Sequence, residues 1–255
     1  MNTKQDYIAV FDSGVGGISV LRHLRRLMPG ERYLYFGDSA NAPYGTKTKD
    51  EVEALTFAAA RRLMARGVKA LVVACNTATS AAIHDLREAY PDTIVIGIEP
   101  ALKLAYDRYH GGGIGVMAPP MTLREEKFEA LMHRYDQSCL VYKIPAPGLV
   151  ELVERGQADS PEAESLLREL FAPYQGKLDE MVLGCTHYPF AAKAISRVLG
   201  SGVALLDGGD GTARETRRRL AEAGLLENGT GEVILTNSLP DESILELSRK
   251  LLDEK

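Results

Sequence analysis

The sequence predicts an α/β fold made of two similar halves, each with a mainly parallel sheet flanked by helices. Short apolar runs alternate with amphipathic stretches along the chain, and this alternation is typical of parallel strands joined by crossover helices. Cys75 and Cys185 each follow an apolar run and precede a helical pattern, 110 positions apart. That spacing is about the size of one small α/β domain, so each half is expected to place one thiol at the same structural position.

The individual elements follow from hydrophobic periodicity, with apolar runs read as strands and apolar positions three and four apart read as helices. In the first half we expect strands at 7–11, 32–36, 70–74 and 93–98, and helices at 16–27, 49–66, 79–89 and 101–109. In the second half we expect strands at 114–118, 140–144, 180–183 and 204–207, and helices at 123–135, 148–155, 161–172 and 189–199. The chain then ends with helices at 212–223 and 241–252 around a strand at 232–236.

Composition and charge exclude several classes of function. The chain has 255 residues and a net charge of −5, and its longest basic run, Arg217–Arg219, lies in a helical pattern that is expected to face solvent. Nucleic-acid binding is therefore not expected. No apolar run approaches the ~20 residues that a membrane span requires, and residues 1–6 lack the apolar core of a signal peptide. We expect a cytoplasmic protein with no membrane partner.

The cysteines and histidines argue against a structural disulfide or metal site. There are three cysteines, an odd number with wide spacing and no CxxC pair, so free thiols in a reducing compartment are expected. The histidines are scattered without metal-ligand spacing, and no metal is expected. Cys139 has no polar neighbours that suggest chemistry, and we interpret it as a buried core residue.

The two remaining cysteines stand in matching polar surroundings. One strand leads into Cys75-Asn76-Thr77 and the other, after one glycine, into Cys185-Thr186-His187. A thiol at a strand end before a helix lies near backbone N–H groups, which favour its thiolate form. Two thiols on opposite sides of a carbon atom can remove a proton from one face and return a proton to the other. His187 is a candidate to assist such proton transfer.

Two loops that follow strands are further candidates, because open α/β sheets bind ligands at the carboxyl ends of their strands. The segment 12–17, DSGVGG, resembles a dinucleotide-binding turn poorly, since Ser19 stands where the third glycine would fall. We expect instead that Asp12 receives an ammonium group and that the following N–H groups receive an anion, the alternative being a plain helix N-cap. The segment 37–45 is rich in small turn residues that let backbone approach a ligand.

These motifs together resemble the glutamate racemase family. The stretches VFDSGVGGISV (10–20), GDSANAPYG (37–45), ACNTATSAA (74–82), IEPA (98–101) and LGCTHYP (183–189) occur in that family's order and spacing. The resemblance implies two pseudo-symmetric α/β domains with the active site between them. It further implies that residues 1–97 and 207–255 form the first domain, to which the C-terminal segment returns, and that residues 98–206 form the second.

The resemblance also implies a role for individual residues. It implies that Cys75 acts on the D-enantiomer and Cys185 on the L-enantiomer of glutamate, with assistance from Asp12, Asp38, His187 and Glu154. It implies no cofactor, D-glutamate for peptidoglycan as the product, and a homodimer as a frequent assembly. The positions that match substrate-binding residues are Asp12, Ser13, Pro43, Tyr44, Gly45, Asn76, Thr77, Thr122, Thr186 and His187.

Several positions in the second half depart from the family pattern. Pro119 stands where threonine is usual, although Thr122 matches the second threonine of that motif. Glu125 replaces a serine, Glu151 replaces a proline, and DGGDG at 207–211 replaces an aspartate–serine pattern. The loss of threonine at 119 leaves open a racemase of aspartate or another amino acid. Two further alternatives are a single-thiol cysteine hydrolase or lyase with His187 as base and a non-catalytic ligand-binding protein.

Overall fold

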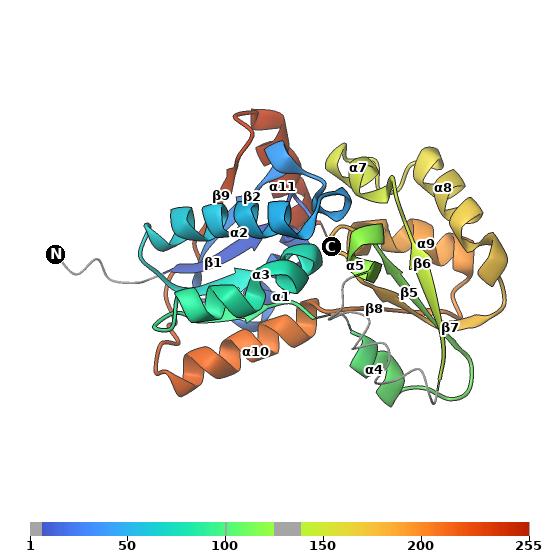
Figure 1. The fold of residues 1–255 in the computed structure, drawn as a ribbon, viewed down its shortest axis with the longest axis horizontal. Helices are drawn as coiled ribbons and strands as arrows, with labels where there is room; N and C mark the ends of the chain where they lie inside the picture. The colour runs from blue at the N-terminus through green and yellow to red at the C-terminus, as the bar shows by residue number, and fades with distance from the viewer. Residues whose placement is uncertain (1–6, 100, 125–138, 255) are drawn as a thin grey trace.

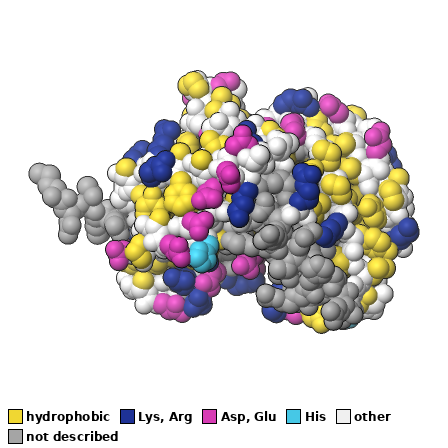
Figure 2. Space-filling model, viewed as in Figure 1, with side chains coloured by type: hydrophobic (Ala, Val, Ile, Leu, Met, Phe, Trp, Pro, Cys, Tyr) yellow, Lys and Arg dark blue, Asp and Glu magenta, His cyan; other side chains and the backbone are white. Residues whose placement is uncertain are grey.

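The computed structural model describes residues 7–99, 101–124 and 139–254, and its two parallel sheets confirm the predicted α/β class. The sheets occupy separate lobes, and the red C-terminal strand lies beside the blue strands of the first lobe (Figure 1). Acidic and basic side chains are interspersed over both lobes on the face shown in Figure 2. Within the described ranges, no helix is both long and apolar enough to cross a membrane.

The first sheet has five parallel strands in the order β4-β3-β1-β2-β9. Its central strands are buried on both faces, which explains why they are continuous apolar runs in the sequence. Because β9 pairs with β2, the C-terminal segment returns to the first sheet. The strands are β1 (Tyr7–Asp12), β2 (Arg32–Gly37), β3 (Val68–Val73), β4 (Ile94–Gly97) and β9 (Val233–Asn237).

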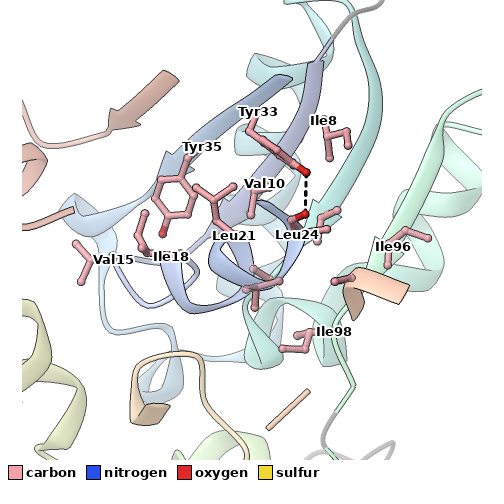
Figure 3. Packing of buried hydrophobic residues seen from close by; sticks show 14 of the residues in the cluster. Ile8, Val10, Val15, Ile18, Leu21, Leu24, Tyr33, Tyr35, Ile96 and Ile98 are labelled. Carbon is pink, nitrogen blue, oxygen red and sulfur yellow. Dashed lines mark hydrogen bonds between the residues drawn. The ribbon is translucent and has the colours of Figure 1, made fainter. Parts of the chain in front are cut away.

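Helices cover both faces of this sheet, and alternate residues of each strand face the two helical layers. Ile8 and Val10 of β1 pack with α1, α10 and α11, whereas Ala9 and Phe11 pack with α2 and α3. Figure 3 shows the first of these cores, where the Tyr33 hydroxyl donates to the Leu24 carbonyl. The helices are α1 (Ile18–Leu27), α2 (Lys49–Met64), α3 (Asn76–Ala89), α10 (Gly209–Glu222) and α11 (Glu242–Asp253).

The second sheet has four parallel strands in the order β6-β5-β7-β8. One face packs with α7, α8 and α9, and the other packs with α4. The strands are β5 (Gly113–Ala118), β6 (Leu140–Pro145), β7 (Leu178–Leu183) and β8 (Ala204–Asp207). The helices are α4 (Leu102–Asp107), α5 (Pro120–Arg124), α7 (Leu149–Glu154), α8 (Pro161–Phe171) and α9 (Ala192–Leu199).

The two sheets share one topology, as the matched cysteines predict. The order β4-β3-β1-β2 of the first sheet corresponds to β8-β7-β5-β6 of the second, with β9 added at the edge of the first. Even a local irregularity is repeated, because the register shifts after Tyr7 in the pairing of β1 with β3 and after Gly113 in the pairing of β5 with β7. The domain division at 97/98 and 206/207 stays a prediction, which the pairing of β9 with β2 supports.

A few elements differ from the expected bounds. Helix α3 begins at Asn76, three residues before the expected start, because Cys75 itself caps the helix by accepting from the Ala78 N–H at 3.5 Å. The expected loop 37–45 contains two 3-10 turns, Ser39–Asn41 and Tyr44–Thr46. Most of the helix expected at 123–135, including Glu125, lies outside the described residues.

Candidate active site

One pocket between the two halves brings the matched cysteines together. It encloses about 560 Å³, open mouth included, and both thiol-bearing residues line it. Cys75 follows β3 after one alanine, and Cys185 follows β7 after one glycine, so both enter from the carboxyl ends of central strands. Ten of the predicted site residues line this pocket: Ser13, Pro43, Tyr44, Gly45, Cys75, Asn76, Thr77, Cys185, Thr186 and His187.

Cys75 lies in surroundings that hold its proton. The thiol is 5% exposed and lies 3.5 Å from the Ser13 hydroxyl, to which it donates. Burial and the nearby Asp12 carboxylate raise the pKa of Cys75 to about 12, although Ser13 and the Ala78 N–H act in the opposite direction. Cys75 is therefore a neutral thiol at pH 7 in the absence of a ligand.

Cys185 lies beside His187, whose ring is in turn paired with the carboxylate of Glu154. Its sulfur is 3.7 Å from Nδ1 of His187, and Nε2 of the same ring is 2.6 Å from Oε1 of Glu154. Burial lowers the pKa of His187, but the contacts with Cys185 and Glu154 outweigh burial and leave this pKa well above 6.5. Burial alone would raise the pKa of Glu154, yet His187 holds it below its ordinary value. The His187 imidazole is therefore within reach to exchange a proton with the Cys185 sulfur.

Asp12 lies behind the pocket wall and joins the two halves. It is fully buried, and its two carboxylate oxygens accept from the Gly14 N–H at 3.0 Å and from the Thr186 hydroxyl at 2.9 Å. Burial raises the pKa of Asp12, and the nearby His187 opposes that effect. Asp12 is thus close enough to influence Cys75 and His187, while Thr186 stands between the halves as its hydrogen-bond donor.

The glycines of the segment 12–17 allow the second half to approach this closely. A Cβ on Gly14 would overlap the Glu154 carboxylate, and a Cβ on Gly16 would overlap the His187 ring and lie 2.6 Å from the Thr186 hydroxyl oxygen. The backbone N–H of Val15 donates to Oε1 of Glu154 at 2.7 Å. This glycine-rich turn therefore receives side chains of the other half, which explains why it departs from the dinucleotide pattern.

The predicted site residues divide into those that line the pocket and those that lie directly behind its lining. Asn76 lines the pocket, and its Oδ1 atom is buried without a hydrogen-bond partner. Thr122 lies behind Thr77, with the two hydroxyl oxygens 2.9 Å apart, and Asp38 lies behind Tyr44, whose hydroxyl donates to it at 2.7 Å. Asp12, Glu154 and Thr122 therefore support residues that line the pocket rather than line it themselves.

Sequence reasoning missed two kinds of site residue. The first is the apolar wall of Pro120, Ala146, Pro147 and Val150, whose composition resembles any other core segment. The second is Ser39, whose hydroxyl donates to Oε2 of Glu154 at 3.2 Å. Ser39 lies within the quoted segment 37–45, so its loop could be found but its particular role could not.

Among the described residues that line the pocket, none belongs to a group with metal-ligand spacing. Across the described ranges, one group brings three possible ligand atoms within 4.8 Å of one another, namely His84, Asp85 and Glu88. These residues lie on α3 outside the pocket, and acidic groups near a surface histidine are common without a metal.

We predict that Gly16→Ala destabilises the protein by about 1–3 kcal/mol, because the added Cβ overlaps the buried His187 ring and displaces it from its contact with Glu154. Urea unfolding gives the free energy of unfolding. Gly211→Ala is the matched control, since a Cβ there meets nothing within 4 Å and alanine favours the helix. Equal stability of Gly16→Ala and Gly211→Ala would contradict the close contact between the halves.

Comparison with known proteins assigns the chain to a family. The family model described as Asp/Glu/Hydantoin racemase matches residues 16–216. A glutamate racemase of Clostridium botulinum is 48% identical over 256 residues, which cover 99% of each chain. The structure of a Francisella tularensis glutamate racemase in complex with D-glutamate has a TM-score of 0.86 at 27% identity, covering 98% of this chain and 95% of that one. An Escherichia coli glutamate racemase in complex with L-glutamate and an activator has a TM-score of 0.85 at 29% identity, covering 97% and 95%. The family model matches most of the chain, and a relative that is 48% identical spans nearly all of it, so this chain belongs to the Asp/Glu/hydantoin racemase family.

Proposed function

We propose that the protein is an isomerase that interconverts L- and D-glutamate, with Cys75 and Cys185 as its acid–base pair. The observation that carries the proposal is the pair of thiols lining one pocket from equivalent strands of the two halves. The full-length similarity to glutamate racemases supports glutamate as the substrate. The resemblance supports D-glutamate for peptidoglycan as the product, a cytoplasmic location and a homodimer, which stay predictions.

The different surroundings of the two thiols suit reaction from the L-enantiomer. In our mechanism the sulfur of Cys185, with His187 beside it, is the base that takes the α-proton of L-glutamate, while the neutral thiol of Cys75 donates its own proton to the opposite face. The product is D-glutamate, and the thiols have exchanged roles. The raised pKa of Cys75 keeps a proton on the thiol that is proposed to donate.

Neutral donors are proposed to bind the substrate. None of the described residues that line the pocket is Lys or Arg, so the carboxylates are left to hydroxyls and backbone N–H groups. The N-terminus of α3, which begins at Asn76, offers N–H groups and the positive end of a helix dipole. The unpartnered Oδ1 of Asn76 is a suitable acceptor for the substrate ammonium. Asp12 remains a predicted substrate contact, although its oxygens already accept from Gly14 and Thr186.

The same donors address the chemical difficulty of the reaction. The α-hydrogen of an amino acid is a very weak acid, and removing it places negative charge on the α-carbon and its carboxylate. Preorganised hydrogen-bond donors stabilise such charge most strongly where water is excluded. Thr77 is nearly inaccessible, and its hydroxyl oxygen lies 2.9 Å from that of Thr122. With Thr122 as the donor in that pair, the Thr77 hydroxyl is proposed to donate to the α-carboxylate as that charge develops, whereas the Thr186 hydroxyl already donates to Asp12.

Aspartate is the second candidate substrate, and residues of the pocket wall favour testing it. Pro119 and Glu151, two of the departures from the family pattern, both line the pocket. A Cβ on Gly45 would lie 2.5 Å from Cβ of Pro119, so this proline narrows the pocket beside a predicted substrate-binding loop. Glu151 adds a negative charge to a pocket proposed to receive a dicarboxylate.

We predict that Cys75→Ser and Cys185→Ser each lower kcat for racemisation by about a thousandfold or more, because a serine hydroxyl is a far weaker acid than a thiol. Circular dichroism follows racemisation, and proton NMR in heavy water follows exchange of the α-hydrogen. Cys139→Ala is the control, since Cys139 lies in the core on the α4 side of the second sheet.

Each rival function gives a different result in these assays. Near-normal racemisation by either serine variant would contradict the two-thiol mechanism. A trapped covalent adduct on one cysteine, with indifference to loss of the other, would indicate a single-thiol hydrolase or lyase. Glutamate binding by the unaltered protein without α-hydrogen exchange would indicate a binding protein.

We also predict that Glu151→Gln lowers KM for glutamate about two- to fivefold, because it removes a like charge from the pocket wall. KM of the unaltered protein should fall as ionic strength rises, and this salt dependence should weaken in the variant. Glu169→Gln, an exposed position on α8, is the matched control. A higher KM in Glu151→Gln would contradict this prediction and mean that Glu151 binds the substrate. The effect of Glu151 on specificity is measured by kcat/KM for glutamate divided by kcat/KM for aspartate, in the variant and in the unaltered protein.

A further inference from the structure

A short chain of side chains runs from the C-terminal strand to Glu154. The Ser39 hydroxyl donates to Oε2 of Glu154 at 3.2 Å, and the Asn237 amide donates from Nδ2 to the Ser39 oxygen at 2.9 Å. The orientation of that amide is fixed, because its Oδ1 accepts from the Leu239 N–H at 2.9 Å. Neither Ser39 nor Asn237 lines the pocket.

The chain continues from Glu154 to a thiol. The other carboxylate oxygen, Oε1, receives the Val15 N–H at 2.7 Å and lies 2.6 Å from Nε2 of His187. Nδ1 of His187 lies 3.7 Å from the Cys185 sulfur. A path of hydrogen bonds therefore links Asn237, at the end of β9, to the sulfur that is proposed to take the α-proton of L-glutamate.

The contact with Ser39 addresses a specific weakness of a glutamate side chain. Its terminal torsion has broad, shallow minima, so a carboxylate held through one oxygen can rotate. Val15 and His187 both bind Oε1, whereas Ser39 binds Oε2. Holding both oxygens fixes the plane of the carboxylate, and this plane determines the direction in which Oε1 meets the His187 ring.

We propose that Ser39 and Asn237 are positioning residues of the racemase reaction, which hold the Glu154 carboxylate in the plane that aligns His187 with Cys185. The inference rests on the proposed function, since it assigns a part in that reaction to residues that contact neither substrate nor thiol. It gives the C-terminal segment a role in the site as well as in the sheet.

Loss of the Ser39 hydroxyl should change the titration of His187. The titratable groups facing that ring are Cys185 on its own loop, Glu154 on α7 and Asp12 on β1, with Cys75 across the pocket and Glu151 on its wall. Of these, Cys185 and Glu154 hold the pKa of His187 above its ordinary value against the effect of burial. A misaligned Glu154 supports the imidazolium less, so this pKa falls. Activity that requires the imidazolium is then lost at a lower pH.

The test uses two pairs of variants. Ser39→Ala removes the hydroxyl, and Ser39→Thr keeps it. Asn237→Ala removes the whole amide, whereas Asn237→Asp keeps the acceptor for Leu239 but removes the donor to Ser39. In Ser39→Ala the alkaline limb of the kcat/KM profile should move to lower pH by about half to one unit, and kcat/KM should fall about 5- to 30-fold. Because enantiomers have equal free energies, the loss in kcat/KM must be the same for L- and D-glutamate. Ser39→Thr should retain the profile of the unaltered protein, and both Asn237 variants should show the same shift in smaller measure.

Ser238→Ala separates positioning from general support of the loop. The Ser238 hydroxyl accepts from the Ala40 N–H at 2.9 Å, so this variant removes a hydrogen bond between the same two segments without touching Glu154. It should leave the pH profile unchanged. An unshifted profile in Ser39→Ala, or an equal shift in Ser238→Ala, would overturn the inference.

A second measurement does not depend on turnover. Nitrogen-15 NMR of labelled histidine gives the pKa of His187 directly in the ligand-free protein, with the signal assigned through a His187→Gln variant. A lower His187 pKa in Ser39→Ala than in Ser39→Thr and Ser238→Ala supports the inference, and equal values overturn it. If the unaltered protein fails to racemise glutamate, the proposed function fails instead, and the NMR result still decides whether Ser39 positions Glu154.

Discussion

The contact between the glycine-rich turn and the Thr186–His187 loop is the constraint on which the rest of the site depends. Thr186 donates to Asp12 across the two halves, and the Ser19 hydroxyl donates to the Thr186 carbonyl at 2.9 Å. Val153 and Phe190 of the second half are buried in the same hydrophobic cluster as the α1 face of the first sheet, so apolar packing supports these hydrogen bonds. Two thiols on separate sheets can act on one carbon atom only if the sheets are held at a fixed separation. The small residues at this contact make that separation short.

The fold is nearly symmetric, but the electrostatics of its two thiols are not. Cys75 follows β3 and Cys185 follows β7, and these two strands hold the same place in the orders β4-β3-β1-β2 and β8-β7-β5-β6. Cys75 then meets a hydroxyl, a helix N-terminus and a buried carboxylate, whereas Cys185 meets an imidazole that is itself paired with Glu154. Racemisation requires one acid and one base at any moment, and this asymmetry distinguishes the two thiols before the substrate arrives. A perfectly symmetric pair would share one proton without a preferred starting state.

The fold class and most of the pocket could be predicted from the sequence because they depend on local patterns. Buried parallel strands produce continuous apolar runs, and residues at their carboxyl ends were the right ones to consider, including Cys75 and Cys185. Positions that depend on contacts between distant segments could not be predicted. Asn237 reaches the site only because β9 pairs with β2, and nothing in the sequence near Asn237 indicates that pairing. The early start of α3 was missed because a cysteine is an unusual helix cap, although this cap is what places Asn76 and Thr77 on the first turn.

The absence of Lys and Arg among the described pocket residues is consistent with the chemistry that we propose. A cation paired with the α-carboxylate would bind the substrate and the transition state to similar extents, and uniform binding of that kind does not raise kcat. Backbone N–H groups at the start of α3 and the hydroxyl of Thr77 are weaker partners for the ground state. Their hydrogen bonds strengthen as proton removal adds charge to the carboxylate. Glu151 is the one carboxylate among the described residues that line the pocket, so its charge acts directly on a dicarboxylate that binds there. The pocket is therefore suited to stabilise developing charge, and its selectivity for a dicarboxylate is set by the few groups at its wall.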